Sequence, residues 1–351
     1  MPAIPARWED LTAGWFTELL QPRFPGAEVS AAELTWRSDG SNRRARFALR
    51  YGAGSGPDVV FVKAEGEHRE VHARNGNLFN EPRLLASGVP MPLDHAEAYG
   101  VVVDEEALDW IVVMEDVTLR GGDPRDATRP LTVAQATDGV RGLARLHDAH
   151  WGGATDPALT WLQTWAPTQG FQSGLRRRAP EGILRAGGAL PASIASLGGD
   201  GVVDLWVRYV SLLDREPTTL LHADAHVGNC YVLPGDRVGF VDWQVARRGH
   251  WSQDVGCFLQ GAVTEDDRRG GERDVLAAYL TELGRDVDAD EAWVWYRASA
   301  VYGLAIWLST LGTDGYQTRE VSEALALRYA AATVELDAVA ALTELEQEVG
   351  A

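Results

Sequence analysis

The chain has 351 residues, of which 45% are hydrophobic and 24% are charged, so we expect a folded protein with more than one core and not a disordered chain. Its 51 acidic and 32 basic residues give a formal net charge of −19, which disfavours binding to nucleic acid or to an anionic membrane surface. The same charge mildly favours a cationic substrate, although the need for solubility is a sufficient explanation.

The two cysteines and the apolar segments indicate the compartment. Cys230 and Cys257 do not form a CxxC pair, so neither a disulfide framework nor a cysteine zinc site is predicted. The N-terminal segment has no long apolar run behind basic residues, and no apolar stretch elsewhere is long enough to span a bilayer. We therefore expect a cytoplasmic protein that is neither secreted nor membrane-spanning; the sequence does not indicate its oligomeric state.

The first third of the chain has the pattern of a small antiparallel sheet. Apolar residues at helical spacing behind the acidic pair Glu9-Asp10 predict a helix over residues 12–20. The polar segments SDGSN and GAGSGP separate runs of alternating residues and predict turns between strands. We expect strands over residues 33–37, 44–51, 58–63, 100–103 and 109–114, and a second helix over 78–85.

After about residue 118 the pattern changes from strands to helices. A short strand-rich insertion interrupts this part, and the sequence PGD predicts the turn of a hairpin within it. We expect helices over residues 133–150, 202–213 and 274–351, a loop or short helices over 179–201, and strands over 219–222, 230–233 and 238–241.

These patterns predict an α+β protein with two lobes. Residues 1–118 would form a small antiparallel-sheet lobe, ending in a hinge, that binds a nucleotide. Residues 119–351 would form a larger, mostly helical lobe that carries a catalytic loop and an acceptor site. A cleft is expected between two such lobes.

The segment LLHADAHVGNCYVLPGDRVGFVDWQ carries the predicted chemistry. It places His222, Asp224 and Asn229 as H-x-D-x-x-x-x-N, and Asp242 follows at the end of an apolar strand. Phosphoryl transfer to a hydroxyl needs a carboxylate that orients the nucleophile and accepts its proton, and oxygen ligands for Mg²⁺. Asp224 is therefore the predicted catalytic base, and Asn229 and Asp242 are the predicted Mg²⁺ ligands. An isolated Asp-x-x-x-x-Asn is common in loops for structural reasons, but the strands around this one favour catalysis.

The two histidines of this segment allow another interpretation. In an extended segment His222, Asp224 and His226 would lie on one face and could form a zinc or iron site. The sequence marks no third nitrogen or sulfur ligand elsewhere. We therefore interpret His222 as a structural support of the catalytic loop.

A lysine in the first third is the predicted phosphate contact. The run VVFVKAE ends a strand with Lys63 among apolar residues, where a lysine is costly to bury unless it pairs with phosphate or carboxylate. Glu81 in the following helix is the predicted partner, and Glu70 is the alternative. A lysine–glutamate pair of this kind holds the nucleotide phosphates in kinases. A surface ion pair is the other interpretation.

Two further segments are predicted to contact ATP. The loop SDGSN has small residues that let backbone N–H groups approach phosphate oxygens, and Ser41 is the predicted contact. This loop lacks the G-x-G-x-x-G pattern, so an ordinary turn is the alternative. In DWIVVMEDVT the backbone from Glu115 to Val117 is predicted to bind an adenine edge, and a plain edge strand is the alternative.

HADAHVGN followed by VDWQ resembles the catalytic motif and the following metal-binding Asp of the aminoglycoside phosphotransferase superfamily, which includes choline kinases and ecdysteroid-kinase-like proteins. The similarity extends to Lys63 and Glu81, to the helix end LARLHDAHW and to Asp254 in WSQDVGCFL. The similarity covers roughly residues 30–310, and the segment with HADAHVGN and VDWQ is the part that is specific to this superfamily.

This resemblance implies a protein-kinase-like fold that uses ATP and Mg²⁺ to phosphorylate a small-molecule alcohol. It implies Asp224 as base, Asn229 and Asp242 as metal ligands, and Lys63 as phosphate contact. Ala223 departs from the family, which commonly has Gly at this position, and a positive φ would be unfavourable for Ala.

We therefore expect a kinase that phosphorylates a hydroxyl of an aminoglycoside, amino alcohol, sugar, macrolide or steroid-like alcohol. Most of the 13 tryptophans are expected in the core, and some in the acceptor pocket. One alternative is a noncatalytic nucleotide-binding module of the same fold, which the joint presence of the predicted site residues disfavours. The other is a protein kinase, which the absence of an A-P-E segment and of an activation loop disfavours.

Overall fold

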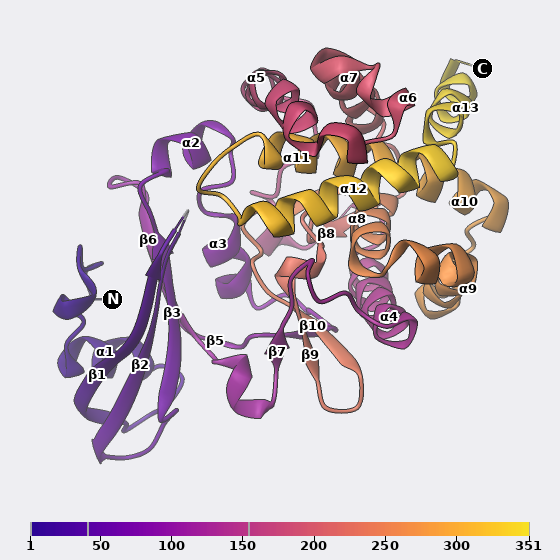
Figure 1. Cartoon of the computed structure of the whole chain (residues 1–351). Helices are drawn as coiled ribbons and strands as arrows, with labels where there is room; N and C mark the ends of the chain where they lie inside the picture. The colour runs from indigo at the N-terminus through magenta and orange to yellow at the C-terminus, as the bar shows by residue number, and fades with distance from the viewer. Residues whose placement is uncertain (1, 41, 154, 351) are drawn as a thin grey trace. The chain divides into compact units, whose positions relative to one another are not determined.

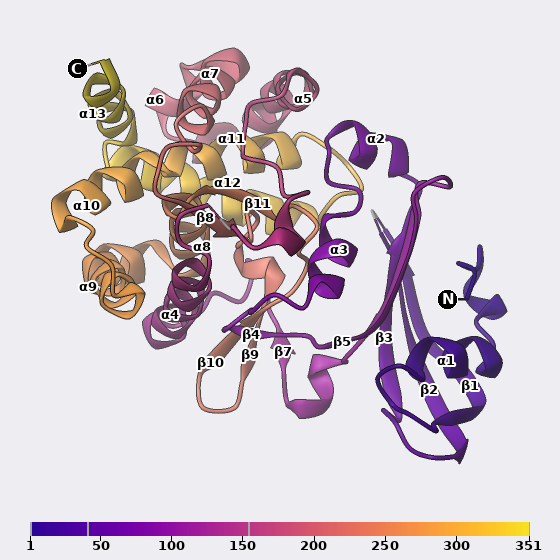
Figure 2. The ribbon, with the colours of Figure 1, turned by 180° about the vertical axis from the view of Figure 1, so that it is seen from behind.

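The computed structural model describes residues 2–40, 42–153 and 155–350 and divides into two units (Figures 1 and 2). The first unit comprises Met1–Val89 and His95–Arg120, and the second comprises Pro90–Asp94 and Gly121–Ala351. The first is built on an antiparallel sheet and the second is mostly helical, which confirms the predicted α+β fold class.

The first unit contains a five-stranded sheet in the order β1-β2-β3-β6-β5, with antiparallel pairing throughout. Helix α1 begins at Ala13, where the hydroxyl of Thr12 caps the helix by accepting a hydrogen bond from the backbone N–H of Trp15. The elements of this unit are η1 (Trp8–Asp10), α1 (Ala13–Leu20), β1 (Glu28–Asp39), β2 (Asn42–Ala53), β3 (Val59–Glu65), α2 (Arg69–Arg74), α3 (Asn80–Ser87), β5 (Ala98–Asp104), β6 (Asp109–Met114) and η2 (Val117–Arg120).

The two faces of this sheet have different roles. One face packs with α1 into a hydrophobic core, to which β3 contributes Val60 and Val62. Because successive side chains of a strand point to opposite faces, Phe61, Lys63 and Glu65 lie on the other face. The alternation of β3 therefore directs Lys63 away from the core of the sheet.

The second unit consists of helices around two small sheets, whose strand orders are β4-β10-β9-β7 and β11-β8. Its helices are α4 (Val133–Ala149), α5 (Gln169–Ala186), α6 (Ala192–Ala195), α7 (Gly198–Val210), α8 (Ser252–Ala262), α9 (Glu265–Leu283), α10 (Ala289–Ala298), α11 (Ala300–Leu311), α12 (Arg319–Glu335) and α13 (Ala338–Gly350), with the short turns η3 (Pro157–Leu159), η4 (Gly187–Ala189) and η5 (Val227–Asn229). Its strands are β4 (Asp94–His95, of which Asp94 belongs to this unit), β7 (Asp123–Pro124), β8 (Thr218–Leu221), β9 (Cys230–Leu233), β10 (Arg237–Phe240) and β11 (Arg247–His250).

The expectation of a loop or short helices over 179–201 is wrong for its first part, which belongs to the 18-residue helix α5. Pro180 lies inside this helix. Small buried residues on one side allow α5 to pack closely on α11: a Cβ added at Gly182 would lie 1.8 Å from the carbonyl oxygen of Leu308. Tertiary packing thus overrides the low helix propensity of Gly and Pro. Helices α8 and α9 also begin before residue 274, earlier than expected.

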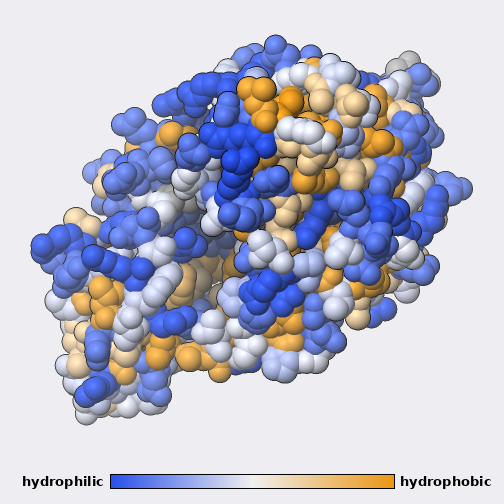
Figure 3. Space-filling model, viewed as in Figure 1, coloured by the Kyte–Doolittle hydropathy of each residue, from blue (hydrophilic) through white to orange (hydrophobic). Residues whose placement is uncertain are grey.

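The surface is largely hydrophilic on the side that Figure 3 shows, with smaller hydrophobic areas between the hydrophilic residues. Across residues 2–40, 42–153 and 155–350, every helix is too short or too polar to cross a membrane.

Candidate active site

Asp224 lies in the loop between β8 and η5, and its carboxylate is held by Asn229 at the end of η5. The Nδ2 amide of Asn229 donates hydrogen bonds to the backbone carbonyl oxygen of Asp224 over 3.0 Å and to its Oδ2 over 3.1 Å. Both side chains are partly exposed. The amide nitrogen of Asn229 faces Asp224, which leaves the Oδ1 of Asn229 as an acceptor on the other side of the amide.

Asp242 follows β10, and two hydrogen bonds bring its neighbour Val241 to the loop of residues 222–229, the predicted catalytic loop. The backbone N–H of Val241 donates to the carbonyl oxygen of Asn229 over 2.9 Å. The ring Nε2 of His222 donates to the carbonyl oxygen of Val241 over 3.0 Å. The three predicted residues Asp224, Asn229 and Asp242 therefore lie on adjacent segments of the same unit.

Both histidines of the loop support its backbone. The Nδ1 of His222 accepts a hydrogen bond from the backbone N–H of Asp224 over 3.3 Å, so the ring proton lies on Nε2. The Nδ1 of His226 accepts from the backbone N–H of Gly228 over 3.0 Å, and burial lowers the pKa of His226 to about 4. Within the described part of the chain, no three His, Cys, Asp or Glu side chains are grouped to hold a metal. The zinc or iron interpretation gains no support from this arrangement.

Asp254, in the first turn of α8, binds the backbone at the start of the loop that contains Asp224. Its Oδ2 accepts a hydrogen bond from the backbone N–H of His222 and its Oδ1 accepts one from the N–H of Ala223, each over 2.7 Å. His147 also contacts Oδ2, through its Nε2 at 3.2 Å. Asp254 is fully buried. The resemblance includes Asp254 but gives it no role. Its signal in the sequence is that Asp254 is the single charged residue of the segment SQDVGCFLQGA.

The first unit holds the predicted phosphate contact. The Nζ of Lys63 lies 2.5 Å from Oε2 of Glu81 on α3, and both side chains are buried. Glu70, the alternative partner, is exposed on α2. The structure therefore pairs Lys63 with Glu81.

Glu65, two residues after Lys63, is a fully buried carboxylate that sequence reasoning missed. Its Oε2 accepts a hydrogen bond from the indole N–H of Trp110 over 2.9 Å, and its Oε1 accepts from the backbone N–H of Gly66 over 3.0 Å. The Nδ1 of His72 lies 2.9 Å from Oε1. The Nζ of Lys63 is 6.0 Å from the centre of the Trp110 ring, so the indole that binds Glu65 also lies near the lysine ammonium ion. The sequence VKAE could have indicated this carboxylate, because residues two apart on a strand lie on the same face and Glu65 therefore lies beside Lys63.

The remaining predicted nucleotide contacts have different outcomes. Ser41 lies outside the described residues. The backbone N–H of Glu115 donates to the carbonyl oxygen of Glu97 over 2.8 Å, so of its two backbone groups only the carbonyl is left for a nucleotide. Val117 begins the short helix η2, where the helix itself supplies no acceptor for the N–H. A carbonyl and an N–H are the pair of groups that the edge of a purine can use.

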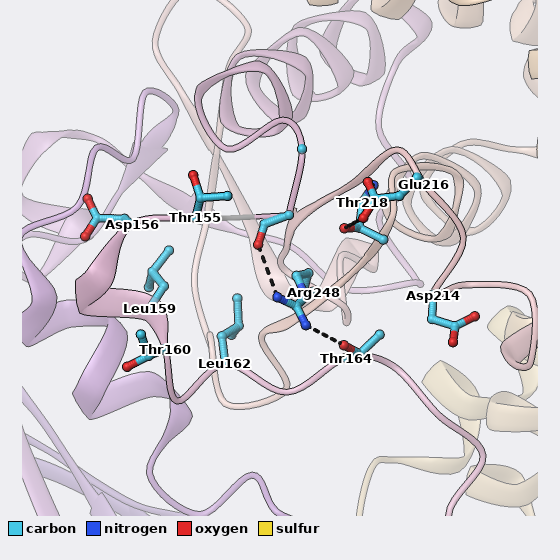
Figure 4. A pocket seen from close by; sticks show the side chains of 12 residues that line it. Thr155, Asp156, Leu159, Thr160, Leu162, Thr164, Asp214, Glu216, Thr218 and Arg248 are labelled. Atoms are coloured by element: carbon cyan, nitrogen blue, oxygen red, sulfur yellow. Dashed lines mark hydrogen bonds between the residues drawn. The ribbon is translucent and has the colours of Figure 1, made fainter.

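A cavity of about 480 Å³ in the second unit contains none of the predicted site residues (Figure 4). Arg248 lines it, and its guanidinium donates to the carbonyl oxygen of Gly153 over 3.4 Å and to the hydroxyl of Thr164 over 3.0 Å. Thr218, the first residue of β8, lines the cavity, whereas the catalytic loop follows the other end of this strand. The cavity is therefore distinct from the predicted catalytic loop.

Comparison with known proteins identifies the family and the fold of the chain. A family model described as the phosphotransferase enzyme family matches residues 36–298. No curated protein sequence matches the chain. Among solved structures, a spectinomycin phosphotransferase, APH(9)-Ia, in complex with ADP and spectinomycin is 15% identical, with a TM-score of 0.53 over 95% of this chain and 100% of that chain.

Two other solved structures show the same fold. An amicoumacin kinase in complex with AMP-PNP, Ca²⁺ and Ami is 14% identical, with a TM-score of 0.52 over 87% of each chain. An ethanolamine kinase from Plasmodium vivax is 12% identical, with a TM-score of 0.52 over 87% of this chain and 83% of that chain. Together with the family model, these similarities confirm the predicted superfamily and its protein-kinase-like fold.

Proposed function

Because the chain belongs to the phosphotransferase enzyme family, we propose that it is a kinase that transfers the γ-phosphate of ATP, with Mg²⁺, to a hydroxyl of a small molecule. The observation that carries this proposal is the catalytic loop, in which Asn229 holds the partly exposed carboxylate of Asp224. Proteins of the same fold are named for spectinomycin, amicoumacin and ethanolamine, and two of them were solved with ADP or with AMP-PNP and Ca²⁺. Aminoglycosides, amino alcohols, sugars and steroid-like alcohols are the acceptor classes that we propose.

In the proposed reaction Asp224 orients the acceptor hydroxyl and takes its proton. The hydroxyl oxygen forms a bond to the γ-phosphorus while the bond from that phosphorus to the β–γ bridging oxygen breaks, and ADP leaves. Little covalent chemistry is required of the protein, so the rate comes mainly from positioning and from neutralisation of charge. The hydrogen bond from Asn229 restricts the rotation of the Asp224 carboxylate and so supports this role.

The proposed metal ligands fit a hard cation. Asn229 offers an amide oxygen and Asp242 offers a carboxylate, which are the donor types that Mg²⁺ prefers. Phosphate and water oxygens complete the octahedral shell of Mg²⁺ in sites of this kind, so two protein ligands suffice. The bound ion would neutralise charge on the phosphates.

We assign the nucleotide contacts to residues 1–118 and the catalytic loop and acceptor site to residues 119–351. Lys63, held by Glu81, would bind phosphate oxygens, and Ser41 would contribute through the loop between β1 and β2. The carbonyl of Glu115 and the N–H of Val117 would bind the edge of adenine. The pairing of Lys63 with Glu81 supports the first of these assignments, because Glu81 fixes the position of the buried ammonium ion, which would be costly to bury without a partner.

Two substitutions test this proposal. Asp224→Asn is expected to lower turnover by about 10³-fold or more and to leave MgATP affinity nearly unchanged, because it removes only the base. Asp242→Asn is expected to weaken nucleotide binding only when Mg²⁺ is present. Affinity would be measured by calorimetry with ATP, and turnover by mass spectrometry of a metabolite extract incubated with the protein, ATP and Mg²⁺.

Asp266→Asn is the matched control, because its carboxylate is 91% exposed on α9. It should leave both measurements unchanged. Normal turnover by both active-site variants would refute the assignment. MgATP binding without any phosphorylated product in the extract would favour a noncatalytic nucleotide-binding module instead.

A further inference from the structure

Three polar residues of strand β2 lie opposite Lys63 and its neighbours on the same face of β3. In the antiparallel register Arg44 lies opposite Lys63, Asn42 opposite Glu65 and Arg46 opposite Phe61. Residues directly opposite each other in an antiparallel pair project from the same face of the sheet. Arg44 and Asn42 therefore share with Lys63 the face that points away from the hydrophobic core.

Arg44 differs from the other arginines of the sequence NRRAR in its contacts. The Nε of Arg43 donates to the carbonyl oxygen of Glu65 over 2.9 Å, and Arg46 forms an ion pair with Asp116. Arg44 is exposed, and it has no acceptor among residues 2–40, 42–153 and 155–350. Glu81 neutralises Lys63, so Arg44 is the cation of this opposed pair whose charge an anion on this face of the sheet would balance.

Asn42 provides a second and independent observation. Its side chain is only 4% exposed, and no acceptor in the described part of the chain receives a hydrogen bond from its Nδ2 amide. A buried donor without an acceptor is unfavourable, so such a group in a native fold requires an explanation. A ligand oxygen on this face of the sheet would satisfy the Asn42 amide and the Arg44 guanidinium together.

We propose that Arg44 and Asn42 form an anion subsite opposite Lys63 that binds the terminal phosphates of the nucleotide. The identity of the anion rests on the proposed kinase function. The turn SDGSN lacks the G-x-G-x-x-G pattern through which backbone N–H groups can surround phosphate oxygens. Side chains of β2 would supply the missing donors, and the planar guanidinium of Arg44 can bind two phosphate oxygens at once.

The test is calorimetric titration of the full-length protein with MgATP, with adenosine and with inorganic tripolyphosphate. Arg44→Gln is expected to weaken MgATP and tripolyphosphate binding by about tenfold or more and to leave adenosine binding unchanged. Asn42→Ala is expected to weaken the same two ligands by about threefold. Arg44→Lys keeps the charge but loses the two-pronged contact, so it should recover part of the affinity.

Arg50→Gln is the matched control. Arg50 is an exposed arginine on the same strand and the same face, but it lies opposite Ala31 instead of Lys63. It should not change binding of any of the three ligands. Equal losses in Arg44→Gln and Arg50→Gln would reveal a nonspecific charge effect and would overturn the subsite, as would unchanged MgATP affinity in Arg44→Gln. A loss of adenosine binding in Arg44→Gln that matched the loss of MgATP binding would also overturn it.

The outcomes separate this subsite from the kinase function on which it rests. If the unmodified protein bound tripolyphosphate in an Arg44-dependent manner but did not bind MgATP, the anion subsite would stand and the kinase proposal would fall. If MgATP bound and Asp224→Asn lost turnover while Arg44→Gln bound normally, only the subsite would fall. Should Arg44→Gln fail to fold, Arg44→Lys and Asn42→Ala would decide the question with the same three ligands.

Discussion

The backbone N–H of Ala223 donates a 2.7 Å hydrogen bond to Oδ1 of Asp254, and Ala223 adopts a φ of +65°. Glycine adopts this left-handed conformation without penalty, whereas alanine does not. The Nε2 of Gln253 donates to the carbonyl oxygen of Ala223 over 3.0 Å, so both sides of the residue are held. These contacts impose the conformation and set the direction in which the chain leaves toward Asp224.

Asp254→Asn is expected to lower the free energy of unfolding by about 2 to 4 kcal/mol. The carboxylate now accepts hydrogen bonds from two backbone N–H groups. The amide of Asn would place its NH₂ group against one of them, and that buried N–H would lose its acceptor. Urea unfolding measures this loss. Asp266→Asn, on the exposed surface of α9, should change the same quantity by less than about 0.5 kcal/mol, and equal effects of the two substitutions would contradict the anchoring role.

Substitutions at Ala223 test the strain of the left-handed residue. Ala223→Gly relieves the strain but removes a buried methyl group and adds entropy to the unfolded chain, so the free energy of unfolding should change by less than about 1 kcal/mol. Ala223→Val should lower it by more than about 2 kcal/mol, because a β-branched residue resists a positive φ. Ala225 is equally buried and has no positive φ, so Ala225→Gly should cost about 1 to 2 kcal/mol. A larger loss in Ala223→Gly than in Ala225→Gly would argue against strain at residue 223.

Elements with strong periodicity could be predicted from the sequence. The strands around Lys63, the helix over 133–150 and the hairpin that precedes Asp242 all occur within a few residues of their expected positions. Each depends on local pattern, either alternation or helical spacing. The first part of the segment 179–201 was not predicted as helix because α5 is stabilised by close packing against α11. A local sequence pattern does not show this tertiary contact.

The polar contacts of the site show the same limit. The role of Asp254 depends on hydrogen bonds to backbone groups of residues 222 and 223, which any sequence would offer equally. The contact between Glu65 and Trp110 joins residues 45 positions apart, and only the register of β3 against β6 brings them together. The choice between Glu70 and Glu81 likewise required knowledge of which helix faces β3.

The buried pair of Lys63 and Glu81 is expected to serve function more than stability. Glu81→Leu removes the carboxylate 2.5 Å from a buried ammonium ion and should lower the free energy of unfolding by about 3 kcal/mol. The double variant Lys63→Met with Glu81→Leu should return to within about 1 kcal/mol of the unmodified protein, because no unpaired charge stays buried. Calorimetry should nevertheless detect no MgATP binding by the double variant.

The exposed ion pair of Arg176 with Asp204, whose atoms lie 2.6 Å apart, is the control for this comparison. Asp204→Asn should lower the free energy of unfolding by less than about 1 kcal/mol. A double variant at Lys63 and Glu81 that stayed as unstable as Glu81→Leu would show that this pair stabilises the fold, and normal MgATP affinity in the double variant would exclude the pair from nucleotide binding.

The stability of the protein should fall as the pH drops below about 6.5, because His226 resists protonation in the folded state. Burial lowers the pKa of His226 from 6.5 to about 4, so between these values the unfolded chain binds a proton that the folded chain does not. The contribution of His226 is therefore fully present above pH 6.5 and is lost as the pH falls toward 4. From pH 7 to pH 5 the contribution of His226 to the free energy of unfolding should fall by about 2 kcal/mol.

Urea unfolding of His226→Asn at pH 7 and pH 5 tests this linkage. The Asn oxygen can replace Nδ1 as acceptor for the N–H of Gly228 but does not titrate, so the variant should lose about 2 kcal/mol less than the unmodified protein over this range. Exposed His68 is the control, and His68→Gln should keep the pH dependence of the unmodified protein. His250, whose pKa burial lowers to about 3, adds a similar contribution in all three proteins, so part of the pH dependence should persist in His226→Asn. If His226→Asn and the unmodified protein lost equal stability between pH 7 and pH 5, His226 would not be the group that resists protonation.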